Sequence, residues 1–313
     1  MSVVEPTPSA VAPLPAAHRR ALRLPFGLSA VRFLGYAGTA FFALTILVAL
    51  LAPLIDPVDP VKQDLLKRFA PPFWAEGGSM DHPLGTDQLG RDVLSRLMHG
   101  ARVSLLVGIS ATLVSCLVGT TLGLVSGYFA GLPGRRGGWV DRMLMMLTEM
   151  ALAIPGVLLA IAAAALFGGS LLNLIIILSI FGWVVFARLT RGIVLSLHRR
   201  SFVESAVVLG AGHRRVLLRH MLPYVLPQIV VVAALQVGFM ILVESALSYL
   251  GLGVQPPTPT WGRMVAEGRD ILSKTPWVAV FSGLAITLTV LSVNFMGDLL
   301  RTRLVGGARG GAR

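Results

Sequence analysis

The chain has 313 residues, of which 55% are hydrophobic and only 13% are charged, and its mean hydropathy is +0.77. Soluble domains carry about 25% charged residues and disordered chains need low hydrophobicity, so the composition excludes both a soluble enzyme and a disordered chain. The net charge of +12 would indicate nucleic-acid binding in a soluble protein, but a membrane protein gains such an excess from cytoplasmic Lys and Arg. The single cysteine, Cys116, lies in an apolar run and cannot form an internal disulfide. A polytopic membrane protein is predicted.

Six segments are long and apolar enough to be membrane-spanning helices, for which about 20 residues are needed. In chain order, we expect spans over residues 33–55, 103–129, 143–167, 171–186, 221–243 and 275–297. The third span begins near residue 143 because the uncharged stretch 150–187 is too short for two straight spans and the Gly-Gly-Ser break between them. The predicted fold is therefore all-α, with six transmembrane helices and both termini on one side of the membrane.

Lysine and arginine are unequally distributed between the two sides of these spans. One set of segments holds 18 of them: the N-terminus, residues 132–142, residues 188–220 and the tail from residue 298. The other set, residues 56–102 and 248–274, holds nine, balanced by nine acidic residues. By the positive-inside rule the first set is cytoplasmic. This distribution accounts for the basic charge without a nucleic-acid partner.

The two ends of the chain are expected to lie outside the folded core. Residues 1–30 contain five prolines and few large apolar groups, which predicts a disordered cytoplasmic leader, and residues 301–313 are expected to form a cytoplasmic tail. Arginines before the first span resemble the start of a secretory signal. However, the uncharged run that follows has 23 residues, and the apolar region of such a signal has about 7–15. We therefore expect the first span to be an uncleaved anchor.

Residues 31–102 are predicted to hold the first span, an outer segment and an elbow helix that lies in the membrane interface. Asp87 and Arg91, and likewise Asp92 and Arg96, are spaced four residues apart beside apolar residues, as in an interfacial amphipathic helix. Each such pair contributes only about 0.3–0.5 kcal/mol, so we interpret the pairs as solvating a helix face, not as forming a site. The three outer-side tryptophans are interpreted as interface anchors and not as ligand-stacking groups: Trp74, Trp261 and Trp277.

The longest cytoplasmic connection is residues 188–223. Within it, Ser201 and Glu204 have the spacing of a capping box, so we expect a helix that begins at Ser201. Glycines in the run 210–212 are expected to end this helix, since glycine adopts left-handed turn geometry at little cost. A basic helix over residues 213–221 follows. The pattern predicts two short helices joined by a glycine elbow, an element rigid enough to be pushed.

Three sequence blocks resemble one family of bacterial transporters. The first has the spacing of the EAA loop of ABC-importer permeases: Glu204-Ser205-Ala206, Gly210 and Met221-Leu222-Pro223. Ser205 and Met221 replace the alanine and isoleucine usual in that loop. Residues 82–105 resemble the segment before the second span of the C-type subunit of dipeptide and oligopeptide permeases, and residues 245–262 resemble its outer loop. The resemblance extends over about residues 30–305.

The resemblance implies a type I ABC-importer permease fold, with residues 103–300 as the transmembrane core and residues 188–223 as a cytoplasmic coupling loop. It further implies a second, B-type permease subunit, two ABC ATPases and an extracytoplasmic substrate-binding protein, in the inner membrane of a bacterium. ATP and Mg would be bound by the ATPases, and no cofactor by this chain. The residues that it assigns to ATPase coupling are Glu204, Ser205, Ala206, Gly210, Ala211, Met221, Leu222 and Pro223. A plain helix-capping role is the alternative for Glu204, and the two roles are compatible.

None of these sequence blocks identifies the transported solute. Members of the family with similar blocks carry dipeptides, oligopeptides, nickel chelates, opines or glutathione, and peptides are the class that the C-type resemblance favours. By its position, the outer segment 56–102 is also a candidate contact for the binding protein.

Two acidic residues fall within or beside the predicted spans. A charge at the bilayer centre costs about 2.5–3.5 kcal/mol, so Glu149 needs a partner or water. Pairing with Arg142 is the preferred interpretation, and lining of the translocation pathway or a proton relay are the alternatives. Glu244 is expected near the outer surface, where solvation is cheap, and gate or loop anchoring is preferred to substrate contact. Pro155 and Pro227 predict helix kinks.

Motifs for catalysis are absent from the sequence. None of the three lysines follows a glycine, so there is no G-x-x-x-x-G-K-[ST] phosphate loop. The six histidines and Cys116 form no H-E-x-x-H motif or Cys/His cluster, so we expect neither a metal site nor enzyme activity. The rival hypotheses are an ion-gradient-driven secondary transporter, which needs more intramembrane ion ligands than Glu149, and a polytopic membrane enzyme, for which we find no nucleophile–base pair.

Overall fold

The computed structural model describes residues 28–55, 58–132, 135–198 and 200–304, which form helices and loops without a β-strand. The longer helices are α1 (Leu28–Ile55), α2 (Val93–Gly131), α3 (Arg135–Ala153), α4 (Gly156–Phe167), α5 (Leu171–Leu197), α8 (Leu222–Tyr249) and α10 (Pro276–Leu304). The shorter elements are the 3-10 helix η1 (Leu65–Lys67), α6 (Ser201–Val208), α7 (His213–Arg215), the π-helical turn η2 (Val216–Met221) and α9 (Trp261–Asp270). Most of the predicted leader and tail lies outside the described residues, but residues 28–30 are helical, so the leader was predicted three residues too long.

Six membrane crossings are present by length and composition, if the bent pair of α3 and α4 is counted as one. Five helical stretches pass this test alone: Arg32–Ile55, Val93–Gly131, Leu171–Leu197, His213–Tyr249 and Pro276–Leu304. α3 and α4 pass it together and are bent by 80° at their junction. Pro155 stands at this break, as predicted, because proline lacks an N–H and clashes with the preceding helical turn. The prediction of six spans is confirmed, with the third one broken.

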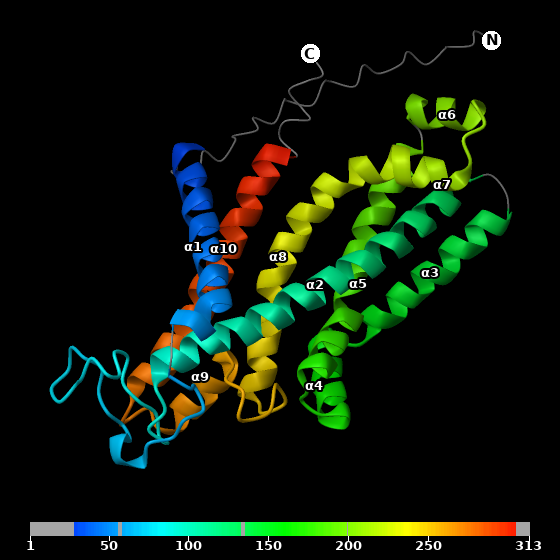
Figure 1. Ribbon diagram of the computed structural model, residues 1–313. Helices are drawn as coiled ribbons and strands as arrows, with labels where there is room; N and C mark the ends of the chain where they lie inside the picture. The colour runs from blue at the N-terminus through cyan, green and yellow to red at the C-terminus, as the bar shows by residue number, and fades with distance from the viewer. Residues whose placement is uncertain (1–27, 56–57, 133–134, 199, 305–313) are drawn as a thin grey trace, which may run out of the picture.

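The long helices lie side by side between two differently built ends (Figure 1). α6 and α7 occupy one end, together with the start of α1 and the end of α10. The opposite end holds α4, α9 and the outer segment 58–92. α1 packs closely on α10 at Gly35. A Cβ atom built at this glycine would lie only 2.8 Å from the Cβ of Leu299, so a larger residue would not fit.

A row of glycines allows α2 and α5 to approach each other closely. Three of them are spaced four residues apart on α2: Gly119, Gly123 and Gly127. A Cβ built at Gly123 would lie 2.7 Å from the Cβ of Thr190, and one at Gly127 would lie 2.9 Å from the Cβ of Val194. Membrane helices associate through such small-residue rows because dispersion contacts, not water exclusion, hold them together.

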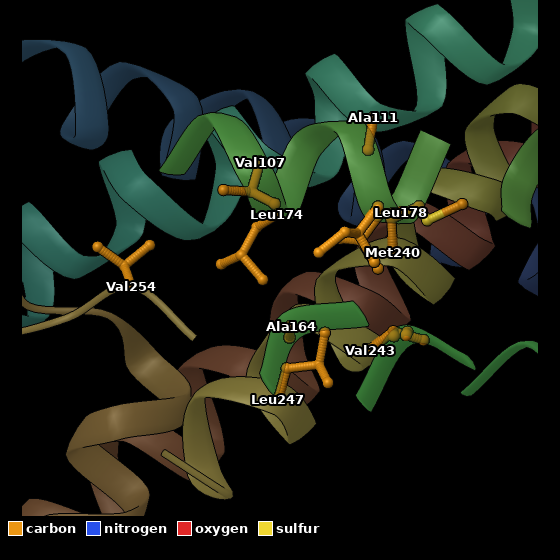
Figure 2. Packing of buried hydrophobic residues seen from close by; sticks show 11 residues of the cluster. Val107, Ala111, Ala164, Leu174, Leu178, Met240, Val243, Leu247 and Val254 are labelled. Carbon is orange, nitrogen blue, oxygen red and sulfur yellow. The ribbon is translucent and has the colours of Figure 1, made fainter. Parts of the chain in front are cut away.

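Two of the apolar clusters that connect the helices lie around α5 and α8. One fills the space between α2, α4, α5 and α8 (Figure 2): Val107, Ala111, Ala164, Leu174, Leu178, Met240, Val243 and Leu247, with Val254 of the following loop. The second joins the α6 end of the spans to the connection between α5 and α8 and includes Leu124, Tyr128, Val194, Val203, Val216, Met221 and Val225. This second cluster fixes the position of the connection relative to α2, α5 and α8.

Most helices extend beyond the predicted spans, and two of these differences affect the description of the loops. α5 continues to Leu197, so residues 188–197 belong to a span and not to the loop. The prediction ended this span at the first arginine, but Arg188 and Arg191 are helical and line a cavity. α2 begins at Val93 and runs without interruption to Gly131. The separate elbow helix was therefore a wrong prediction. Asp92 caps α2 by accepting the Ser95 amide at 2.7 Å, and no proline interrupts the helix after it.

Candidate functional site

The residues that resemble the EAA loop form a projection at one end of the helices (Figure 1). On α6, Glu204 and Ser205 are exposed, whereas Ala206 is buried. The predicted capping box is wrong. Ser201 is already helical, and the cap position belongs to Arg200, whose side chain makes no capping bond. The Glu204 side chain is therefore free to point outward, and no ion pair is recorded for it in the part of the chain that the structure describes.

Gly210 forms the predicted elbow. Its φ of +81° lies in the left-handed region, and its N–H donates to the carbonyl of Val207 at 3.0 Å. The N–H of Ala211 donates to the carbonyl of Ala206, also at 3.0 Å. These two bonds form a Schellman motif, which satisfies the last carbonyls of a helix. A Cβ at Gly210 would meet nothing within 4 Å, so its backbone conformation, and not crowding, calls for glycine.

After the elbow the chain re-enters the membrane in one continuous helical stretch, His213–Tyr249. The predicted second helix is therefore helical but merges with the fifth span. Met221 is fully buried, Leu222 is half-buried and Pro223 is exposed in the first turn of α8. The π-helical turn Val216–Met221 lies between them and the elbow, and such turns are frequent at functional sites.

Polar and aromatic contacts connect the elbow to the neighbouring spans. The Tyr128 hydroxyl at the end of α2 lies 2.6 Å from Nδ1 of His213. Nε2 of His198, which follows α5, lies 2.9 Å from the Tyr128 carbonyl oxygen. The rings of Phe202 on α6 and Tyr224 on α8 are stacked with centroids 4.9 Å apart. These contacts therefore join the elbow to α2, α2 to the end of α5, and α6 to α8.

The tip of the projection is apolar. Val208 is 85% exposed and Leu209 is 86% exposed, and the neighbouring Val207 is also exposed. Large apolar side chains that are exposed next to one another often mark an interaction site. These residues lie next to Glu204 and Ser205 but outside the motif, so spacing alone did not identify them.

Glu149 lies in a cavity of about 770 Å³ between α3 and α5. Arg142 also lines this cavity, but both side chains are exposed and no ion pair between them is recorded among the described residues. The predicted Glu149–Arg142 pair is therefore wrong. Arg191 instead pairs with Asp141, with Nε–Oδ1 and Nη2–Oδ2 distances of 2.6 and 2.8 Å. Glu149 faces open space, which is compatible with the pathway-lining alternative.

Glu244 is far from solvent, contrary to the prediction. Its relative exposure is 0%. The Ser248 hydroxyl donates to Oε1 at 2.7 Å, the Ser245 hydroxyl lies 3.4 Å from Oε2, and Ser104 on α2 is a further partner. The carboxyl group therefore joins α8 to α2 at the outer end of the bundle. This contact agrees with an anchoring role but not with a cheaply solvated position.

The outer segment contains a buried charge network that spacing did not predict. Asp87 accepts hydrogen bonds from Nε of Arg91 at 2.7 Å and Nη1 of Arg96 at 2.5 Å. Both arginines also contact Glu267 of α9, at 2.8 and 2.7 Å. Three of the four residues are buried, so the interpretation of these charges as a solvated helix face is wrong. They connect the outer segment, α2 and α9.

The tryptophans on the outer side differ from one another. Trp74 is exposed, in agreement with an interface anchor, but Trp261 is only 2% exposed. Nε1 of Trp261 donates to the Leu97 carbonyl at 2.9 Å, and Nε1 of Trp277 lies 3.3 Å from the Thr86 carbonyl. Trp261 is thus a packing residue between α9 and α2, and the anchor prediction is wrong for it.

A helical bundle with this number of crossings, and with one short helix held away from it on a glycine elbow, agrees with the membrane component of a transport system. Residues 95–309 match the family described as binding-protein-dependent transport system inner membrane component. The chain belongs to this family, whose members have the type I importer permease fold. It is therefore a multi-pass inner-membrane transport protein, as the sequence predicted.

The chain is similar to named permeases over most of its length. It is 42% identical over 267 residues to the di/tripeptide transport system permease protein DppC of Pseudomonas aeruginosa, covering 85% of this chain and 86% of that protein. It is 40% identical over 298 residues to the glutathione transport system permease protein GsiD of Pectobacterium atrosepticum, covering 94% and 95%. The GsiD protein of Escherichia coli strain 536 is 41% identical over 264 residues, or 84% of this chain and 83% of that protein.

Proposed function

We propose that this chain is the C-type transmembrane subunit of an ATP-driven importer of short peptides. The observation that carries the proposal is α6, which presents Glu204 and an apolar tip outside the bundle, while its buried Val203 belongs to an apolar cluster shared with residues of α2, α5 and α8. A short helix with an exposed apolar tip is suited to bind a second protein and to transmit its movement. Glu204 and Gly210 then act as parts of a coupling element and not as catalytic residues.

The partners that this role requires are a second, B-type permease, two ABC ATPases and an extracytoplasmic substrate-binding protein. ATP and Mg²⁺ would be bound by the ATPases. The α6 end of the bundle is then cytoplasmic, with both termini, in agreement with the larger share of Lys and Arg in the segments at that end. The outer segment and α9 would face the binding protein. Closure of the ATPases would move the α6 end. The pathway between the two permeases would then open in turn to the outside and to the cytoplasm.

Short peptides are the proposed solute class. Support comes from the names of the similar permeases, one for di- and tripeptides and one for glutathione, because glutathione is itself a tripeptide. The selectivity of such systems resides largely in the binding protein, so the class and not the individual peptide is proposed.

Site-directed crosslinking tests the partner assignment. With Cys116 replaced by Ser the chain has no other cysteine, and Val208→Cys places a thiol at the exposed tip of α6. In actively importing membranes, a thiol-to-amine crosslinker should join this position to the ATPase. Leu66→Cys, at a 97% exposed residue of the outer segment, is the matched control and should give no ATPase product. An active transporter in which Val208→Cys also gives none would contradict the proposal.

The energy source distinguishes the importer from a secondary transporter. Uptake of a peptide mixture should stop when ATP is depleted and continue when an ionophore collapses the ion gradients. The opposite result would establish an ion-gradient-driven transporter, the rival hypothesis that the cavity carboxylate Glu149 leaves open.

A further inference from the structure

The cavity between α3 and α5 has an unusual arrangement of charges for membrane-spanning helices. Arg142 and Glu149 lie in α3 and Arg188 lies in α5, all within stretches that qualify as spans. All three side chains are exposed, and no ion pair is recorded for them in the described ranges. A charged side chain that faces lipid within a span is costly. The three groups therefore require water, a partner subunit or a charged ligand in the cavity.

The remaining charges of the cavity neutralise each other. Asp141 accepts two hydrogen bonds from Arg191, at 2.6 and 2.8 Å, and a third from the Ser126 hydroxyl at 2.6 Å. This pair forms a fixed wall between α3 and α5. What remains available to a ligand is one carboxylate, Glu149, and two guanidinium groups on Arg142 and Arg188.

We propose that this cavity is a transient binding site for the two charged ends of a short peptide. Glu149 would accept the α-ammonium group, and Arg142 with Arg188 would bind the α-carboxylate, for which the planar guanidinium is well suited. The volume of about 770 Å³ falls within the range of small-molecule pockets, roughly 300–1,000 Å³. The proposal deepens the proposed function and rests on it, because it assigns the peptide class to residues of this chain.

The spacing of the charges limits the length of the peptide. Glu149 and Arg142 are seven positions apart on one helix, which is about 10 Å at 1.5 Å per residue. An extended chain covers at most about 3.3–3.6 Å per residue, so three residues span this distance, and two suffice once the side chains reach inward. Arg142 is nearer the α6 end than Glu149. The peptide would therefore lie with its carboxylate directed toward the cytoplasm.

An anionic lipid headgroup is the other ligand that two free arginines attract. Glu149 argues against it, because a carboxylate in the same cavity repels a phosphate and matches an ammonium group. A lipid headgroup is therefore treated below as an outcome that would overturn the proposal.

The test uses the complete transporter in proteoliposomes, with binding protein outside and ATP inside. An equimolar mixture of alanine peptides of two to five residues is supplied, and internal peptide is measured by mass spectrometry per assembled complex. The wild type is expected to import the two- and three-residue peptides best. Glu149→Gln and the double variant R142Q/R188Q should each lower that uptake about tenfold or more, the usual effect of losing a hydrogen bond to a charged group. Glu149→Asp should retain part of the uptake.

Two measurements separate this role from a structural one. ATP hydrolysis stimulated by loaded binding protein should stay within twofold of wild type in both variants, since α6 is untouched. Arg301→Gln, at an exposed arginine of α10 outside the cavity, is the matched control and should import normally.

Each contrary result has a distinct meaning. A wild type that imports none of the alanine peptides, although its binding protein binds them, contradicts the proposed function itself. Normal import by both cavity variants overturns the site alone. Import that falls in R142Q/R188Q, is unaffected in Glu149→Gln and follows the phosphatidylglycerol content of the vesicles identifies a lipid headgroup site and also overturns the proposal.

Discussion

Replacing Gly210 by valine should separate ATP hydrolysis from transport. Gly210 has φ +81° and open space around its missing Cβ, so the substitution acts only through the backbone. A residue other than glycine in the left-handed region costs about 1–2 kcal/mol, and strained cases reach about 3 kcal/mol. At about 1.4 kcal/mol per factor of ten, the population of the native elbow falls roughly 5- to 150-fold. We expect peptide uptake in proteoliposomes to fall about tenfold or more, while ATP hydrolysis and the amount of protein in the membrane persist.

Two matched variants serve as controls for the backbone effect at Gly210. Gly210→Asn should import within about twofold of wild type, because asparagine tolerates the left-handed conformation. Gly212→Val should also be tolerated, because Gly212 has φ −64° and ψ 154°, which any residue adopts, and equally open surroundings. Import by Gly210→Val at the level of these two controls would refute the reasoning that the elbow geometry transmits the ATPase movement.

Substitutions at three further positions test the packing of the spans by thermal unfolding of the purified protein. Asp87→Ala leaves two arginines without their shared carboxylate and should destabilise the protein by about 3–5 kcal/mol. The control is Asp59→Ala, at an exposed position, which should cost less. Equal melting points of the two variants would disprove the network. Gly123→Val should cost about 1–3 kcal/mol by overpacking against α5, and an unchanged melting point would show that α2 and α5 can separate freely. Glu244→Gln keeps an acceptor for Ser248 and should melt near wild type, whereas Glu244→Ala should lose about 1–3 kcal/mol; the reverse order would contradict the anchoring role.

Hydropathy predicted the spans because the bilayer imposes one length on every crossing. The breaks at Pro155 and at the Gly-Gly-Ser run were also predictable from the sequence, since proline and glycine act through local backbone geometry. The elbow at Gly210 was predicted for the same reason. Local chemistry determined all of these features, and none of them depends on which helix lies beside which.

The errors about buried charges have a common physical origin, because they concern contacts between distant parts of the chain. The spacing of Asp87 and Arg91 indicates a weak surface pair, and only Glu267, which approaches through α9, makes the site a buried network. Glu244 ends an apolar run, and its burial depends on Ser104 of α2. Apolar periodicity is likewise unable to distinguish a helix face that meets lipid from one that meets another helix, so the cavity around Glu149 was not predictable.

The uninterrupted length of α2 has a mechanical consequence. Its 39 residues make a rod of about 58 Å, with Arg96 of the outer network near one end and Tyr128, which contacts the elbow at His213, near the other. If such a rod pivots by about 5° at one end, its far end sweeps about 5 Å. A displacement of α2 at the end that contacts the elbow is thus carried, through one helix, to the end that holds the buried charge network.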